Sequence, residues 1–235
     1  MPGGGTRRAS SKPVPGAVQV IEQDFQKDLG HTVIETSCTI VPGSFGDALG
    51  SCTLSTTSAS QADSALVQTG AVADLTRHNV IFEARVRVDC AGTALGANNQ
   101  VFIGLMPGAA VSSTAMDATN YHVGFQLVAT GNAINGIFDD ATNESNGRDT
   151  GADYVDNTWH TYKIDCTNLA DVKLYVDGVE DTGALVVMDD IPGSGSGYAS
   201  AQPLCGTVQI HKASGTTVDS VSVDYMRIEL HPKSK

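Results

Sequence analysis

The sequence predicts an all-β protein, an antiparallel β-sandwich that carries an extended N-terminal arm. Three observations lead to this prediction. Glycine is abundant, with 25 residues, and only 17% of the residues are charged, a composition typical of chains in which tight turns join many strands. Runs of alternating apolar and polar residues recur along the chain, as half-buried strands require. No run keeps a helical period over three turns, so we expect sheets packed face to face without crossover helices.

Composition divides the chain into three parts. Residues 1–16 consist mainly of glycine, proline, serine and basic residues, which cannot bury much apolar area, so they predict an arm without a core of its own. Residues 17–231 show one composition and no internal repeat, which predicts a single domain, because β-sandwiches often reach this size as one domain. Residues 232–235 form a short basic tail.

The strand signals appear in order along this domain. Residues 18–25 alternate and would open the sheet, and residues 79–89 give the clearest signal. In that second run the even-numbered residues from Phe82 to Val88 are apolar, whereas the odd-numbered ones from Glu83 to Arg87 are charged, as a two-residue period requires. The other expected strands are 99–106, 121–129, 134–140, 159–167, 171–176, 206–213 and 218–230.

Turn residues separate these runs. Gly131-Asn132 and Asp177-Gly178 each predict a hairpin, the second of type I′, because both central residues of that turn need positive φ. The apolar phase slips between Tyr225 and Met226, which predicts a β-bulge or a change in strand burial.

The cysteines favour a reduced protein. There are five, an odd number, and no two are spaced C-x-x-C: Cys38, Cys52, Cys90, Cys166 and Cys205. We therefore expect mostly buried free thiols, with a Cys38–Cys52 bridge as the alternative. The N-terminus lacks the apolar segment of a secretion signal, and no apolar run is long enough to span a bilayer, so we expect folding in the cytoplasm of the producing cell and no membrane partner.

Charge is distributed unevenly along the chain. The net charge is −12, yet residues 1–16 carry Arg7, Arg8 and Lys12 and no acidic residue. The acidic body argues against nucleic acid as a partner. The three basic residues of the arm are candidates for docking on an acidic neighbour, and a simple solvated tail is the alternative.

Four stretches resemble the concanavalin A-like lectin/glucanase jelly roll: VIFEARVRV at 80–88, WHTYKID at 159–165, DVKLYVDG at 171–178 and VDYMRIEL at 223–230. The resemblance covers most of residues 18–230 and implies a jelly-roll β-sandwich. Together with VFIGLM at 101–106 and the low-complexity N-terminus, the chain more narrowly resembles virion structural proteins of tailed bacteriophages.

The narrower resemblance implies a non-enzymatic capsid decoration or cement protein, made in the host cytoplasm and located on the capsid surface. It would dock on the shell through the arm and the sandwich edge. Its partners would be the major capsid protein or other virion subunits, and it would self-associate as a homo-oligomer. The alternative is a carbohydrate-binding module, displayed on the virion for adhesion to host-surface glycans. Because one fold hosts many functions, the site has to be judged by its own residues.

The sequence contains no catalytic constellation that we can identify. Retaining glycosidases need two carboxyl groups roughly 5–5.5 Å apart, whereas Glu83 and Asp89, six residues apart on one strand face, are separated by roughly 20 Å. No G-x-S-x-G motif is present, and His160 is expected to be a half-buried strand residue. We therefore expect no catalytic residue and no enzymatic activity.

The sequence offers candidate residues for a metal site and for a glycan site. The richest oxygen cluster lies within 139–156, with Asp139, Asp140, Asp149 and Asp153 as possible Ca²⁺ ligands. Its spacing matches no D-x-D-x-D-G loop, so a solvated acidic loop without metal or cofactor is favoured. Tyr154 and Tyr198 are the candidate aromatic platforms for a glycan, whereas Trp159, the single tryptophan, begins a strand and is expected at the core or its edge.

Overall fold

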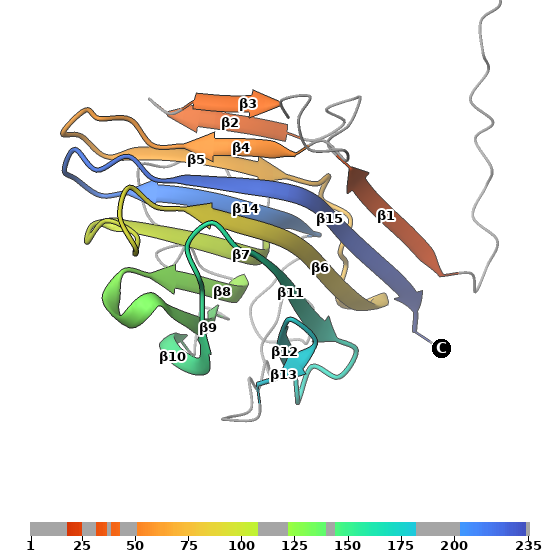
Figure 1. Cartoon of the computed structure of the whole chain (residues 1–235). Helices are drawn as coiled ribbons and strands as arrows, with labels where there is room; N and C mark the ends of the chain where they lie inside the picture. Colours follow the sequence, from red (N-terminus) through yellow and green to blue (C-terminus); the bar gives the residue numbers. More distant parts are fainter. Residues whose placement is uncertain are drawn as a thin grey trace, which may run out of the picture.

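The computed structural model describes residues 18–24, 32–36, 39–42, 51–107, 122–139, 144–181 and 203–233. The arm with Arg7, Arg8 and Lys12 lies outside these ranges, and so do Cys38, Asp140 and Tyr198. The described chain forms two antiparallel sheets packed face to face (Figure 1). The prediction of an antiparallel β-sandwich is therefore confirmed.

The first layer is an eight-stranded sheet. Its strand order is β13–β12–β11–β6–β15–β4–β3, and β1 pairs with β15 beside this path. Figure 1 shows β1 and β15, from the two ends of the described chain, running side by side. The strands are β1 (Gln19–Asp24), β3 (Thr39–Pro42), β4 (Cys52–Ser55), β6 (His78–Asp89), β11 (Trp159–Cys166), β12 (Lys173–Val176), β13 (Val179–Glu180) and β15 (Ser220–Pro232).

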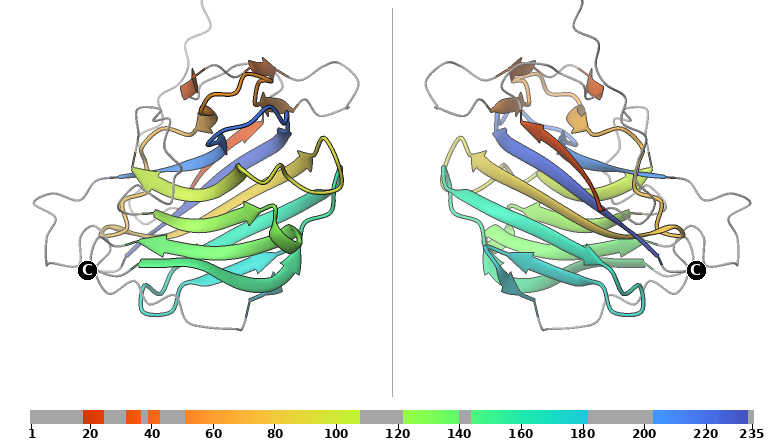
Figure 2. Two further views of the ribbon diagram at one scale, coloured as in Figure 1. Left: turned by 90° about the vertical axis from the view of Figure 1, so that its left-hand side faces the viewer. Right: turned by 90° about the vertical axis from the view of Figure 1, so that its right-hand side faces the viewer.

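The second layer is a seven-stranded sheet in the order β10–β9–β8–β7–β14–β5–β2. The two side views of Figure 2 look onto the two layers, with green β8 and β9 in front on the left and teal β11 in front on the right. The strands are β2 (Thr32–Thr36), β5 (Asp63–Gln68), β7 (Asn99–Pro107), β8 (His122–Val128), β9 (Ala133–Asp139), β10 (Glu144–Asp153) and β14 (Leu204–Lys212).

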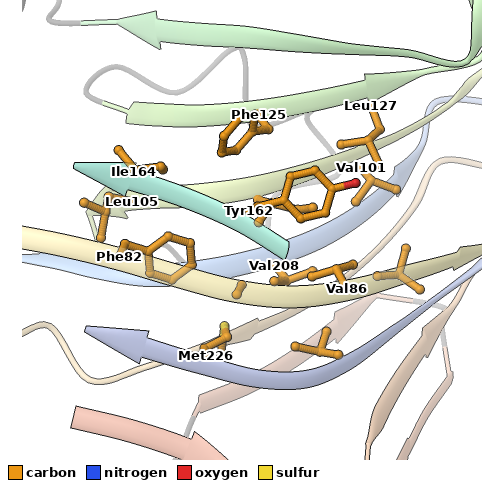
Figure 3. Packing of buried hydrophobic residues seen from close by; sticks show 14 of the residues in the cluster. Phe82, Val86, Val101, Leu105, Phe125, Leu127, Tyr162, Ile164, Val208 and Met226 are labelled. Carbon is orange, nitrogen blue, oxygen red and sulfur yellow. The ribbon is translucent and has the colours of Figure 1, made fainter. Parts of the chain in front are cut away.

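The core lies between the two sheets and follows the two-residue period of their strands. Phe82 of β6 and Ile164 of β11 enter it from the eight-stranded sheet, and Phe125 of β8 enters from the other (Figure 3). The rings of Phe125 and Tyr162 meet edge to face, with centroids 5.2 Å apart, a favourable aromatic geometry. The alternation predicted for residues 79–89 is thus confirmed, because its even-numbered side chains are buried.

Both predicted hairpin turns are present. Gly131 and Asn132 have φ values of 69° and 57° between β8 and β9, and Asp177 and Gly178 have values of 51° and 78° between β12 and β13. The bulge is also present, but its predicted position is wrong. The register of β15 against β6 shifts between Val223 and Tyr225, so the extra residue is Asp224.

Six described strands lie outside the predicted ranges: β2, β3, β4, β5, β10 and β13. The structure describes four of the five cysteines, and all four are buried free thiols, as expected: Cys52, Cys90, Cys166 and Cys205. No helix in the described ranges is long and apolar enough to cross a membrane.

Candidate functional site

A pocket of about 310 Å³ lies at one end of the seven-stranded sheet, where β7 begins and β8 and β14 end. Three alanines and one threonine supply much of the wall, so short side chains leave the space open. The lining residues are Ala97, Asn98, Asn99, Gln100, Val128, Ala129, Thr130, His211 and Ala213.

Strand register brings the floor of this pocket together. His211 of β14 lies opposite Gln100 of β7, which lies opposite Val128 of β8, so these side chains share the outer face of the sheet. Nε2 of Gln126 donates to Oε1 of Gln100 over 2.8 Å. This bond fixes the Gln100 amide, which leaves its NH₂ group available for other acceptors.

Polar residues continue from the pocket along the outer face of β14 and β5. Nε2 of Gln209 donates to Oγ of Ser64, and Nε2 of Gln68 donates to Oγ1 of Thr207 over 3.0 Å. These four side chains are buried. Gln100 at the edge of the strip is only half-buried, so the pocket is where this amide-rich surface can meet a ligand.

The wall formed by residues 90–99 is held by a buried carboxylate. Asp219, 1% exposed, accepts hydrogen bonds from the backbone N–H of Ala91 (2.9 Å), the N–H of Gly96 (2.7 Å) and Nδ2 of Asn99 (2.5 Å). Bonds to a charged acceptor are stronger than those between neutral groups. Asp219 therefore orders the loop that places Asn98 and Asn99 at the pocket.

No protein-family model and no curated protein matches the sequence. Solved structures do match. A protein of unknown function from Shewanella oneidensis MR-1 aligns with a TM-score of 0.64 at 12% identity, over 96% of this chain and 92% of the other. A carbohydrate esterase of Shiga toxin-encoding bacteriophage phi24B aligns with a TM-score of 0.56 at 18% identity, over 92% of this chain and 100% of the other. The carbohydrate recognition domain of Emp46p aligns with a TM-score of 0.51 at 9% identity, over 88% of this chain and 91% of the other.

The chain has the concanavalin A-like jelly-roll fold. At these identities the similarity establishes the fold and not the function. The resemblance to the lectin/glucanase jelly roll is thereby confirmed for the architecture.

Tyr154 does not occupy a ligand-binding position in this jelly roll. It is 1% exposed, its hydroxyl accepts from the N–H of Leu95 at 3.0 Å, and it donates to the carbonyl of Val128 at 3.2 Å. Burial raises the pKa of this hydroxyl to about 12. The prediction of a glycan platform at Tyr154 is therefore wrong; the residue braces two walls of the pocket from inside.

Within the acidic segment, residues 144–153 form strand β10 rather than a loop, and Asp149 and Asp153 are exposed. Asp139 lies opposite Glu144 at one end of the paired strands β9 and β10, whereas Asp153 lies opposite Ala133 at the other end, roughly 20 Å away. Asp149 caps its own turn by accepting from the N–H of Gly151 at 2.8 Å. Among the described residues no three potential metal ligands converge, so the Asp139, Asp149 and Asp153 carboxylates do not form the Ca²⁺ site that we considered; Asp140 lies outside the described ranges.

His160 is a half-buried strand residue, as predicted. Its Nδ1 lies 2.7 Å from Oδ2 of Asp177, and its Nε2 accepts from the N–H of Val155 at 3.3 Å. With Nε2 acting as an acceptor, Nδ1 carries the proton and donates to Asp177. His160 thus ties two turns of the jelly roll together.

Proposed function

We propose that the chain is a non-enzymatic carbohydrate-binding module whose pocket holds one neutral sugar unit. The observation that carries the proposal is the lining. Among the described residues it offers the amides of Asn98 and Gln100 together with the methyl groups of Val128 and the alanines, and it contains no Asp, Glu, Lys or Arg. Amides donate to and accept from hydroxyl groups, whereas a charged ligand would lack a counter-ion.

The size of the pocket supports the same ligand. A volume of about 310 Å³ lies at the lower end of the range for small-molecule sites, which suits a sugar ring rather than a long chain. The carbohydrate recognition domain of Emp46p shares the fold, which is compatible with this proposal.

The proposal of binding without cleavage rests on the absence of carboxylates among the described residues that line the pocket. Glycoside hydrolysis generally requires two of them, one as acid and one as nucleophile or base. We expect no new reducing ends when the protein is incubated with saccharides that it binds.

The test is a glycan array followed by calorimetric titration of the neutral saccharide that binds, with and without a chelator. Ala213 lines the pocket and is exposed, so Ala213→Phe should fill the space and weaken binding about tenfold or more. Ala170→Phe is the matched control, because Ala170 is an exposed residue of the β11–β12 connection. Equal affinity of both variants would refute the pocket, and loss of binding with chelator would show a metal requirement that we do not expect.

A second role is compatible with the first. We propose that the protein decorates a phage capsid, which the basic residues Arg7, Arg8 and Lys12 and the acidic remainder of the chain favour. The structural similarity to a phage-encoded esterase is consistent with such an origin. The partners would be shell subunits and further copies of the chain, and the location would be the capsid surface after synthesis in the host cytoplasm.

Deleting residues 2–16 tests this second role. The truncated protein should keep its thermal unfolding transition but no longer co-sediment with particles, because the arm supplies the docking charge. If it decorates particles as well as the full chain does, docking through the arm is refuted.

A further inference from the structure

The outer face of the eight-stranded sheet carries a cluster of two arginines around the single tryptophan. The Cζ atoms of Arg85 and Arg87 lie 5.1 Å and 5.0 Å from the centroid of the Trp159 ring. Both distances are within the range of cation–π attraction. We call Trp159, Arg85 and Arg87 the tryptophan cluster.

Register and the bulge of β15 build this cluster. Trp159 begins β11 directly opposite Arg87 of β6, and Arg85 is two residues away on the same face. On the other side of β6, the extra residue Asp224 brings its carboxylate to Arg85, with Nη1 and Oδ2 2.7 Å apart. The arginines are thus positioned by regular strands rather than by a loop.

Charge in the cluster is only half balanced. Asp224 pairs with Arg85, whereas Nε of Arg87 is buried without a hydrogen-bond partner among the described residues. Because both guanidinium groups lie about 5 Å from one ring centroid, they are at most about 10 Å apart, and two like charges at that distance repel by ~1–2 kcal/mol at an effective dielectric constant of 20. An anion bound beside the Arg87 guanidinium would relieve this repulsion.

A second aromatic–cation pair lies on the same face. Nζ of Lys163 is 5.0 Å from the centroid of the Tyr175 ring. Lys163 follows Trp159 by four residues along β11, a distance of roughly 13 Å. Glu83 lies opposite Lys163. Its negative charge offsets part of the positive charge of Lys163, so this second pair is less positive than the tryptophan cluster.

We propose that this face binds an extended acidic saccharide, a polyuronate-type chain with a carboxylate on each unit. One carboxylate is held by Arg87 and Arg85 beside Trp159, and a later one is held by Lys163 beside Tyr175. A sheet face with two aromatic–cation pairs in a row suits a linear chain with repeating carboxylates better than a compact ligand. The site lies on the opposite sheet from the pocket and does not depend on the pocket's ligand.

The tryptophan makes the test direct, because Trp159 is the only one in the chain. We expect oligogalacturonate to change the fluorescence of the full-length protein in a saturable way, with tighter binding by longer oligomers and weaker binding at high salt. A neutral oligosaccharide of the same length should leave the fluorescence unchanged, even when calorimetry shows that it binds in the pocket. Failure of one site is therefore distinguishable from failure of the other.

Variants locate the site. Arg87→Met should weaken oligogalacturonate binding about tenfold or more, and Arg87→Lys should weaken it less, because a lysine keeps the charge but not the planar donors. Lys163→Met should affect only the longer oligomers. The matched control is Arg77→Met, the same substitution at an arginine whose side chain is 79% exposed and pairs with Asp74 at the start of β6; it should bind like the unchanged protein.

Four outcomes would overturn the proposal. They are the absence of a fluorescence change at about 10 mM oligogalacturonate, an equal response to the neutral oligomer, a response to sulfate or polyglutamate but not to oligogalacturonate, and equal losses in Arg87→Met and Arg77→Met. If Arg87→Met fails to fold, as judged by circular dichroism, Arg87→Lys and Lys163→Met still decide the outcome.

Discussion

The ion pair between Lys212 and Asp63 gives the sharpest test of how the sandwich is held together. Both side chains are 0% exposed, and Nζ lies 2.8 Å from Oδ2. Nζ also donates to the carbonyls of Thr57 and Ala59, and the same carboxylate oxygen accepts from N–H and Oγ1 of Thr57. The pair thus fastens the β4–β5 connection to the end of β14. Lys212→Met removes the charge and all three of its contacts while keeping most of the side-chain volume.

The expected loss follows from burial. Removing one partner of a buried ion pair leaves an uncompensated charge and costs about 3–5 kcal/mol, and Oδ1 of Asp63 already has no partner among the described residues. With a urea m-value of about 2–3 kcal/mol/M for a chain of this size, the unfolding midpoint should fall by on the order of 1.5 M. Replacing both residues, with Asp63→Leu added to Lys212→Met, should recover most of the loss.

The pH dependence fixes the cause. Burial tends to raise the pKa of Asp63, but hydrogen bonds from Lys212 and Thr57 outweigh it and hold that pKa below its ordinary value. A carboxyl with a lowered folded pKa contributes stability above its unfolded pKa of about 3.9 and loses it as the pH falls through the folded value. In Lys212→Met burial acts with less opposition, so the pKa of Asp63 rises and the folded state is helped by protonation. The loss in free energy of unfolding relative to the unchanged protein should therefore be greatest near pH 7 and shrink towards pH 3.

Urea unfolding followed by far-UV circular dichroism at pH 3 to 7 measures both effects. Lys173→Met is the control, because Lys173 forms ion pairs with Asp171 and Glu180 at the exposed β12–β13 edge, where we expect little change in the midpoint. A deficit below about 1 kcal/mol in Lys212→Met that does not change with pH would refute the reasoning, since a buried uncompensated carboxylate has to respond to protonation.

Three further outcomes are expected. Asp219→Ala should speed amide hydrogen exchange at Gly96 and weaken ligand binding in the pocket, because the loop loses an acceptor whose hydrogen bonds contribute about 1.5–3 kcal/mol each; unchanged exchange would contradict this. Gly206→Val should destabilise by about 1–3 kcal/mol in thermal unfolding, because a Cβ there would lie 2.6 Å from Cε2 of Phe82. Cys166 should resist iodoacetamide at pH 8 in the folded chain, because burial raises the pKa of its thiol to about 12, and mass spectrometry would detect modification only after unfolding.

Burial on one face decides which strands the sequence reveals. β6 was predictable because its odd-numbered residues face solvent while its even-numbered ones face the core. β5 is buried at every position, so DSALVQ shows no alternation, and strands covered on both faces lack that signal. β10, with the sequence ESNGRDTGAD, contains a single apolar residue and two register shifts. β10 is a strand because it pairs with β9, and its own sequence does not indicate that pairing.

The candidate site was less predictable than the fold for a similar reason. The pocket combines short segments around Gln100, Thr130 and His211, which are far apart in sequence and contain ordinary residue types. Only the register of three strands brings them together. Tyr154 illustrates the reverse error, because an aromatic residue near acidic ones is a reasonable platform candidate until the N–H of Leu95 and the carbonyl of Val128 are seen to satisfy its hydroxyl. The ion pair of Asp224 with Arg85 beside the tryptophan cluster likewise depends on a bulge whose predicted position was wrong.

The two proposed sites lie at the same end of the sandwich but on opposite sheets. β6 ends at Asp89 just after Arg87, and the 90–99 loop then crosses to β7 at the pocket. Stacked sheets are about 10 Å apart, and side chains extend beyond them on both sides, so a short oligosaccharide cannot fill both sites of one molecule. Each site therefore binds independently in an isolated copy. On a surface that carries many copies, a long chain with neutral and acidic units could engage different sites on neighbouring molecules, and its affinity would then rise with copy density rather than with any change in either site.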